Sequence, residues 1–146
     1  MLLTMHVLAG ATVALATGDV LISAPICFAT HAILDALPHW SFPIPKKRTV
    51  RGFMQSFGPD LIGAVVLFAV LMGFFADRWF LLAWGVAWAI LPDWLTLYRK
   101  QQPWKRLLRG FYAFHNAIQW EVSAGPGLAV QAVVGFILVI ALRSRF

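Results

Sequence analysis

Charged residues are scarce in this chain of 146 residues. They make up 12% of the sequence, whereas hydrophobic residues make up 60% and the mean hydropathy is +0.75. A soluble domain carries about 25% charged residues. Half of that charge, combined with long apolar runs, argues against a soluble domain and predicts a polytopic membrane protein that forms a single domain over residues 1–146.

Several sequence features that define common protein classes are missing. The single cysteine, Cys27, lies inside an apolar run, so no disulfide framework is possible. There is no nucleophile elbow, phosphate-binding loop or CxxC motif, and neither Ser41 nor Ser56 has flanking residues typical of a serine nucleophile. No basic segment precedes the first apolar run, so we expect no cleaved signal peptide. The net charge of +6 is expected to reflect membrane orientation and anionic lipid headgroups, and no nucleic-acid partner is expected.

The apolar runs predict an all-α integral membrane fold with about five transmembrane helices. Pro59 suits the first position of the third helix, and the turn signals at Gly18-Asp19 and Asp77-Arg78 separate neighbouring runs. Between the fourth and fifth helices, residues 99–110 and 111–122 are expected to form amphipathic pieces on the membrane surface. The expected membrane helices are Leu2–Thr17, Val20–Leu37, Pro59–Ala76, Trp79–Tyr98 and Leu128–Leu142.

A short sequence occurs twice in the chain. Leu37-Pro38-His39-Trp40 returns as Leu91-Pro92-Asp93-Trp94, 54 residues later, and the same shift aligns His6 with Asp60. We interpret this as a duplication that produces two tandem parallel helical hairpins, residues 1–54 and 55–108, followed by the C-terminal amphipathic piece and the last helix. Since a hairpin returns to the side from which it started, the ionisable residue at each end should lie at one membrane face.

Basic residues predict the orientation of the chain. Nine of the twelve Lys and Arg residues lie in the two connectors around residues 46–51 and 99–109. The positive-inside rule places both connectors and the N-terminus in the cytoplasm, as in a bacterial-type inner membrane protein. Five spans would place the C-terminus outside, which Arg143 and Arg145 oppose. A re-entrant last segment of about 15 residues is the alternative.

The predicted convergence of polar side chains suggests a metal site. His31, Asp35 and His39 share one helix face at spacings of four residues. Imidazole and carboxylate groups suit Zn, Mn or Fe. Asp35 and His115 are candidates for a catalytic base or for outer-shell partners of the ligands. Alternatively, these side chains lie at the headgroups, and Asp60 stabilises a helix N-terminus. The predicted metal ligands are His6, His39, Asp60, Asp93 and His31.

Short motifs resemble known membrane protein families. Met5-His6 with Gly10, followed by a Leu-Pro-acid box, resembles the membrane-bound metal-dependent hydrolases of bacteria and archaea. HAILDALPHW and FHNAIQWE, with Gly127 and Gln131, resemble a group of small bacterial membrane proteins with S-H-x-x-L-D-x-x-P-H and F-H-x-x-x-x-W boxes. The chain has His39 where the first hydrolase box has Asp, and it lacks the hydrolase His-Arg-Gly and Thr-His-Ser box. His115-Asn116 is the nearest substitute, and Gln119 stands where a second histidine is expected.

Two functions follow as hypotheses. The first is a metal-dependent hydrolase at the cytoplasmic leaflet, in which a metal-bound water attacks an anionic lipid-like or phosphate substrate drawn in by the basic connectors. The second is a non-enzymatic subunit of a larger membrane complex, in which histidines are structural or bind haem or pigment. Membrane lipid is an expected partner in both cases, and either a homo-oligomer or a larger complex remains open.

Overall fold

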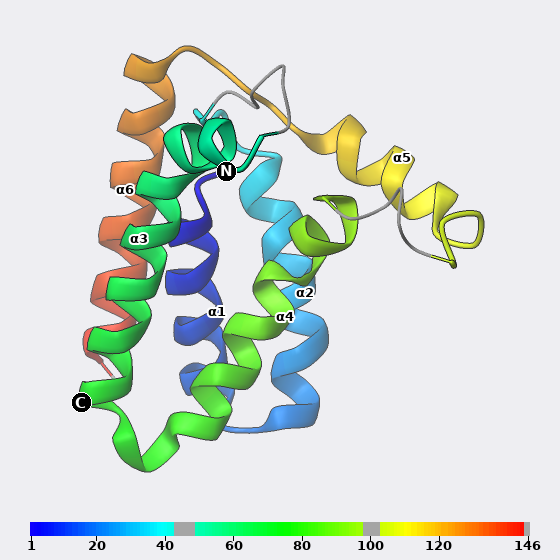
Figure 1. Cartoon of the computed structure of the whole chain (residues 1–146). Helices are drawn as coiled ribbons and strands as arrows, with labels where there is room; N and C mark the ends of the chain where they lie inside the picture. The colour runs from blue at the N-terminus through cyan, green and yellow to red at the C-terminus, as the bar shows by residue number, and fades with distance from the viewer. Residues whose placement is uncertain (43–48, 98–102, 145–146) are drawn as a thin grey trace.

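The computed structural model describes residues 1–42, 49–97 and 103–144, and within them it is all-α (Figure 1). This confirms the predicted fold class. The elements are α1 (Leu3–Thr17), α2 (Val20–Asp35), α3 (Val50–Phe74), η1 (Ala76–Arg78), α4 (Trp79–Leu97), α5 (Arg109–Ile118) and α6 (Ala124–Arg143).

Among the described residues, three helices are long and apolar enough to cross a membrane. They cover Met54–Phe74, Ala76–Thr96 and Ala124–Arg143, each of 20 or 21 residues. Helices α1 and α2 are apolar but have only 15 and 16 residues, although they run alongside the longer helices (Figure 1). Large apolar side chains are exposed on the outer faces of α3 and α6, including Ile62, Val65, Phe136 and Ile137. A surface of this kind fits lipid rather than water, and the chain is a membrane protein.

Helix α1 occupies the centre of the bundle and packs against α2, α3, α4 and α6. Small residues allow α1 and α4 to approach very closely. A Cβ atom on Gly10 would lie 2.7 Å from both the Ala89 Cβ and the Gly85 carbonyl oxygen. Gly10 and Ala14 on α1 therefore face Ala89 and Gly85 on α4, the small-residue spacing typical of tight helix pairs in membranes.

The predicted start of the third helix was wrong. Helix α3 begins at Val50, where the Thr49 side chain accepts a hydrogen bond from the Gly52 amide at 3.1 Å, and Pro59 lies inside the helix. A proline in a helix interior loses one backbone hydrogen bond, which membrane helices tolerate. Helix α6 also begins earlier than predicted, because Pro126 fits the first turn of a helix. Its 20 residues run to the end opposite the N-terminus (Figure 1), which does not fit a short re-entrant segment.

After α2, the chain continues as an extended segment over residues 37–42. Pro38 stops the helix near Asp35, and the His39 amide donates to the Trp120 carbonyl at 3.0 Å while the Val122 amide donates to the His39 carbonyl at 2.8 Å. This isolated β-bridge pairs the segment after α2 with the segment after α5, and so holds the C-terminal ends of the two helices close together. On the other side, Gln131 of α6 donates to the Trp40 carbonyl at 3.0 Å and accepts from the Leu2 amide at 3.1 Å.

The two predicted hairpins share direction but not length. Helices α1 and α3 start at the end where the N-terminus lies, and α2 and α4 return to it (Figure 1). However, α1 has 15 residues and α3 has 25. Pro38 lies beyond the end of α2, whereas its counterpart Pro92 lies within α4. The duplication stays a prediction, and its two copies of the Leu-Pro box have different backbone structures.

Candidate metal centre

Polar and small residues recur every four positions on one face of α1, α2 and α4, and we call each such row a stripe. The three stripes face one another and bring the polar residues together. On α1 the stripe is His6, Gly10 and Ala14; on α4 it is Gly85, Ala89 and Asp93. Because α1 and α4 are antiparallel and touch at Gly10 and Ala89, His6 and Asp93 meet one turn further along. On α2 the buried stripe is Ser23, Cys27, His31 and Asp35. The close packing of small residues thus brings four ionisable side chains together, His6, His31, Asp35 and Asp93, and His115 of α5 lies beside them.

Four ligand atoms from α2, α4 and α5 surround one point. They belong to His31, Asp35, Asp93 and His115 and all lie within 4.8 Å of one another. The His31 Nε2 atom lies 3.0 Å from Asp35 Oδ2, 3.6 Å from Asp93 Oδ1 and 3.1 Å from His115 Nε2. The His115 Nε2 atom lies 3.6 Å from Asp35 Oδ2 and 3.5 Å from Asp93 Oδ1. Ligands held 2.0–2.2 Å from a tetrahedral ion are separated by about 3.3–3.6 Å, so this arrangement fits a metal such as zinc.

Hydrogen bonds around the cluster orient its ligands. His31 Nδ1 lies 2.7 Å from the Ala89 carbonyl oxygen, and only a protonated nitrogen can donate to a carbonyl. A neutral His31 therefore carries its lone pair on Nε2, which faces the other ligands. The Gln119 side-chain amide donates to Asp35 Oδ2 at 2.6 Å. The amino group of Met1 lies 2.6 Å from Asp35 Oδ1.

The cluster opens to its surroundings at one ligand. The side chains of His31 and Asp35 are buried and that of His115 is nearly so, but the Asp93 side chain is 40% exposed. Asp93 lies in the last turns of α4, at the end of the bundle where α5 leans away to one side (Figure 1). Asp93 is therefore the member of the group with the most accessible side chain.

His6 lies next to the four ligands but outside their set. Its ring stacks on His31 with centroids 4.1 Å apart. Its Nε2 atom is 3.3 Å from Asp35 Oδ1 and 3.9 Å from Asp93 Oδ2. The side chain is fully buried, and neither of its nitrogens has a hydrogen-bond partner.

The structure places two predicted ligands elsewhere. Asp60 accepts hydrogen bonds from the Leu3 amide at 2.6 Å, the Thr4 amide at 3.1 Å and the Thr4 hydroxyl at 2.7 Å. It is a cap for the N-terminus of α1, because the first amides of a helix lack partners within the helix. His39 does not share the helix face of His31 and Asp35, because α2 ends at Asp35. Its Nδ1 atom lies 2.9 Å from the Leu37 carbonyl oxygen. Neither belongs to the cluster found among the described residues.

The remaining predictions for the site fare differently. His31 and Asp93 are in the cluster, as predicted. Asp35 and His115, expected to be a base or outer-shell partners, belong to the same group of four. Gln119, which stands where the resemblance expects a second histidine, follows directly after α5 and donates to Asp35. That correspondence was the signal that could have assigned it to the site.

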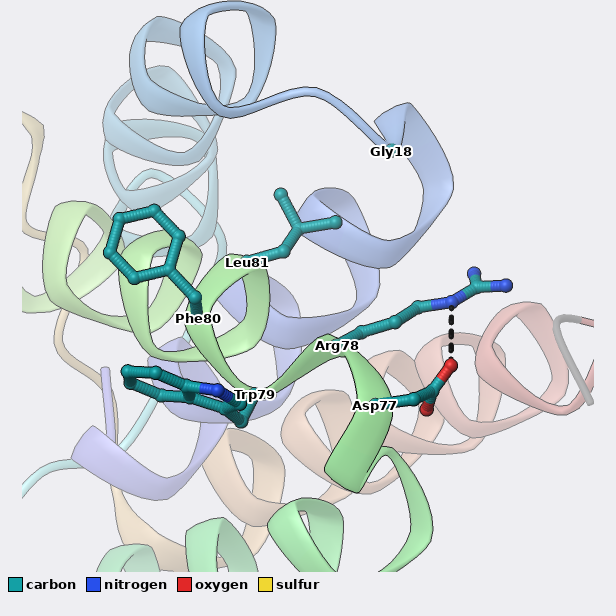
Figure 2. Close-up of a pocket in the computed structure, with 6 residues that line it drawn as sticks. All are labelled: Gly18, Asp77, Arg78, Trp79, Phe80 and Leu81. Atoms are coloured by element: carbon teal, nitrogen blue, oxygen red, sulfur yellow. Dashed lines mark ion pairs between the residues drawn. The ribbon is translucent and has the colours of Figure 1, made fainter.

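A shallow pocket lies at the opposite end of the molecule. It has a volume of about 360 Å³ and lies between the α1–α2 turn at Gly18 and the α3–α4 turn. Figure 2 shows Asp77 and Arg78 paired at its rim, with Arg78 Nε 3.6 Å from Asp77 Oδ2. Both side chains are well exposed, and the pocket has no histidine in its lining. It offers no chemistry comparable to that of the cluster.

Comparison with protein-family models, with curated proteins and with solved structures finds no match for this chain. The functional argument therefore depends on the cluster itself.

Proposed function

We propose that this chain is a metal-dependent hydrolase of the cytoplasmic membrane face, which acts on an anionic lipid-like or phosphate substrate. The observation that carries the proposal is the group of four ligand atoms from His31, Asp35, Asp93 and His115. All four lie within 4.8 Å of one another, and five of their six separations are 3.0–3.6 Å, close to the edges of a coordination tetrahedron. Zn, Mn and Fe all accept this set of two imidazoles and two carboxylates.

The residues in and around the cluster would have different roles in the proposed reaction. A divalent ion bound there would supply Lewis acidity, and a water coordinated to it in addition to the four protein ligands would have its pKa lowered toward about 7. His31, held by the Ala89 carbonyl, and Asp35, held by Gln119, keep the ligand geometry. Asp93, whose side chain is partly exposed, faces the side from which a substrate arrives.

Positive charge near the cluster supports an anionic substrate. Lys105, Arg106 and Arg109 are exposed and lead into α5, which carries His115 six residues after Arg109. Such residues attract phosphate headgroups at a cytoplasmic leaflet. The predicted basic residues Lys46, Lys47, Arg48, Arg99 and Lys100 lie outside the described residues. Together with Arg51, these charges favour a cytoplasmic location for the cluster and for the N-terminus in an inner membrane.

The alternative of a haem- or pigment-bearing subunit fits the geometry less well. Axial histidines bind a haem iron from opposite faces of the porphyrin ring, or a single histidine binds it from one face. Here the Nε2 atoms of His31 and His115 are 3.1 Å apart, and both face carboxylate oxygens. Carboxylates and imidazoles that share one point favour a non-haem ion.

Elemental analysis of the detergent-purified protein tests the proposal. Wild type should hold transition metal at a stoichiometry of at least one ion per chain, and His31→Ala and Asp93→Asn should lose it. Asp77→Asn, an exposed carboxylate at the other end of the bundle, is the matched control and should keep it. Size-exclusion profiles must show that the variants remain folded. A wild-type protein that binds no transition metal, even after incubation with Zn²⁺, Mn²⁺ or Fe²⁺, would falsify the proposal.

The hydrolytic step needs its own assay. Phosphatidic acid and a polyisoprenyl diphosphate in mixed micelles are suitable probes, with release of inorganic phosphate as the readout. Activity should disappear with a chelator and return with added metal. If the protein binds metal but releases no phosphate from either lipid, the proposed substrate class is wrong while the metal centre stands.

A further inference from the structure

Each carboxylate of the cluster has a second oxygen that the four-ligand set does not use. Asp35 directs Oδ2 to His31 and His115, and Asp93 directs Oδ1 to the same two rings. Their other oxygens, Asp35 Oδ1 and Asp93 Oδ2, lie 3.3 and 3.9 Å from His6 Nε2. The two carboxylates therefore stand between His6 on one side and the two other histidines on the other.

His6 is fully buried, and neither of its ring nitrogens forms a hydrogen bond with any residue that the structure describes. Its Nε2 is close to two carboxylate oxygens, yet it is not directed along a hydrogen bond to either of them. Leaving a buried polar atom unsatisfied is costly, and native structures seldom do so without a functional reason. An ion between Nε2 and the two oxygens would give His6 Nε2 a partner, and it would share Asp35 Oδ1 with the Met1 amino group that already donates to it.

The ring stacking gives an independent measure of the spacing. The His6 and His31 rings are nearly parallel, with an interplanar angle of 21° and centroids 4.1 Å apart. In two-metal sites the ions are separated by about 3.5–4 Å and share bridging ligands. Two stacked imidazoles at this distance could each bind one ion of such a pair.

We propose that the centre binds two metal ions, bridged by Asp35 and Asp93. The first ion takes His31, His115, Asp35 Oδ2 and Asp93 Oδ1. The second takes His6 Nε2, Asp35 Oδ1 and Asp93 Oδ2. This inference extends the proposed function, because it assigns the two ions different roles.

Ligand number distinguishes the two positions. The first has four protein ligands, as in closed sites, and the second has three, which leaves a position for water or substrate, as in catalytic sites. The second position is therefore the one at which the phosphate substrate binds. It is also the weaker one, because the Met1 amino group lies 2.6 Å from the same Asp35 oxygen and competes with an ion for it.

Manganese titration of the metal-free protein in detergent tests the inference. Wild type should bind two Mn²⁺ ions per chain, one more tightly than the other, and its paramagnetic resonance spectrum should change from that of an isolated ion to that of a coupled pair as the second site fills. His6→Ala should bind one ion and retain the isolated spectrum at every concentration. His6→Gln is a second variant that preserves side-chain volume, and circular dichroism should show that both remain helical.

The outcomes separate this inference from the proposed function. A single Mn²⁺ ion in wild type, with an isolated-ion spectrum at saturation, overturns the second site and leaves the mononuclear hydrolase in place. Two coupled ions in both wild type and His6→Ala also overturn it, since His6 would then not be a ligand. No Mn²⁺, Zn²⁺ or Fe²⁺ bound at all overturns both.

Discussion

His31 Nε2 lies 3.1 Å from His115 Nε2, across the junction between α2 and α5. This contact joins residues separated by 84 positions in the sequence, and α5 has few other contacts with the helical bundle. Since His31 donates through Nδ1 to the Ala89 carbonyl, its Nε2 lone pair faces a ring that is itself held against two carboxylates. Hydrogen bonds after α5, from the Trp120 amide to the Asp35 carbonyl and from Gln119 to the Asp35 side chain, hold His115 beside His31. If the proposed metal ion binds between the two rings, it should hold α5 there more firmly.

The outer-shell role of Gln119 can be tested by truncation. Gln119→Ala removes the 2.6 Å hydrogen bond to Asp35 Oδ2, and loss of such a partner typically lowers metal affinity by about 10–100-fold. We expect a decrease of this size in a competition titration with a fluorescent zinc chelator. Asn116→Ala, an exposed amide on the same helix, should leave the affinity unchanged. Equal losses in both variants would mean that α5 is merely sensitive to substitution.

Close packing between α1 and α4 should make Gly85 intolerant of a larger residue. A Cβ atom there would lie 2.6 Å from the Gly10 carbonyl oxygen, whereas one on Gly73 of α3 would meet nothing within 4 Å. Overpacking of this kind costs about 1–3 kcal/mol. Gly85→Ala should lower the free energy of unfolding in mixed micelles and weaken metal binding, because it moves Asp93. Gly73→Ala should be neutral or slightly stabilising.

Substitution of Asp60 tests whether this residue caps α1, as the structure shows, or binds metal, as the sequence predicted. Removing a helix cap costs about 0.5–2 kcal/mol, so Asp60→Ala should lower thermal stability by a corresponding amount. Its metal stoichiometry should equal that of wild type, since Asp60 binds the amides of Leu3 and Thr4. A stable Asp60→Ala protein that has lost its metal would restore Asp60 as a ligand.

The proposed membrane orientation can be tested with single cysteines. The native Cys27 is fully buried and should give little background labelling. A membrane-impermeant maleimide added to intact cells should label Asp77→Cys, at the turn opposite the metal centre, and should spare Lys105→Cys. Inverted membrane vesicles should give the reverse pattern. Labelling of Lys105→Cys from outside would place the metal centre at the outer face.

Helix positions were largely predictable because apolar runs and turn residues determine them locally. The expected ranges of α1, α2 and α4 differ from the described ones by no more than two residues at each end. The errors concern prolines. Pro59 was assigned to a helix start, and Pro126 was left outside a last helix that began at Leu128, but each lies within a longer helix. Proline restricts the backbone, but its presence in a sequence does not show whether it lies before a helix, in the first turn or at a tolerated interior position.

The candidate site was predicted in part. The sequence correctly brought His31 and Asp93 together, and it named Asp35 and His115 for neighbouring roles. It also treated residues related by the 54-residue shift as equivalent, and this failed for Asp60. Equivalent positions have equal roles only if their surroundings match, and Asp60 meets the free amides of α1. The stripe of Gly10 and Ala14 with Gly85 and Ala89 was available in the sequence and would have set the register between His6 and Asp93.

The carboxylate that caps α1 is synthesised long after the helix that it caps. Asp60 follows Leu3 by 57 positions, and Asp93 and His115 emerge from the ribosome later still. The first hairpin thus reaches the membrane as two short helices of 15 and 16 residues, with His6, His31 and Asp35 only partly paired. Short apolar segments that contain ionisable groups insert poorly by themselves. Stable insertion of the first half of the chain should therefore wait for translation of the second half.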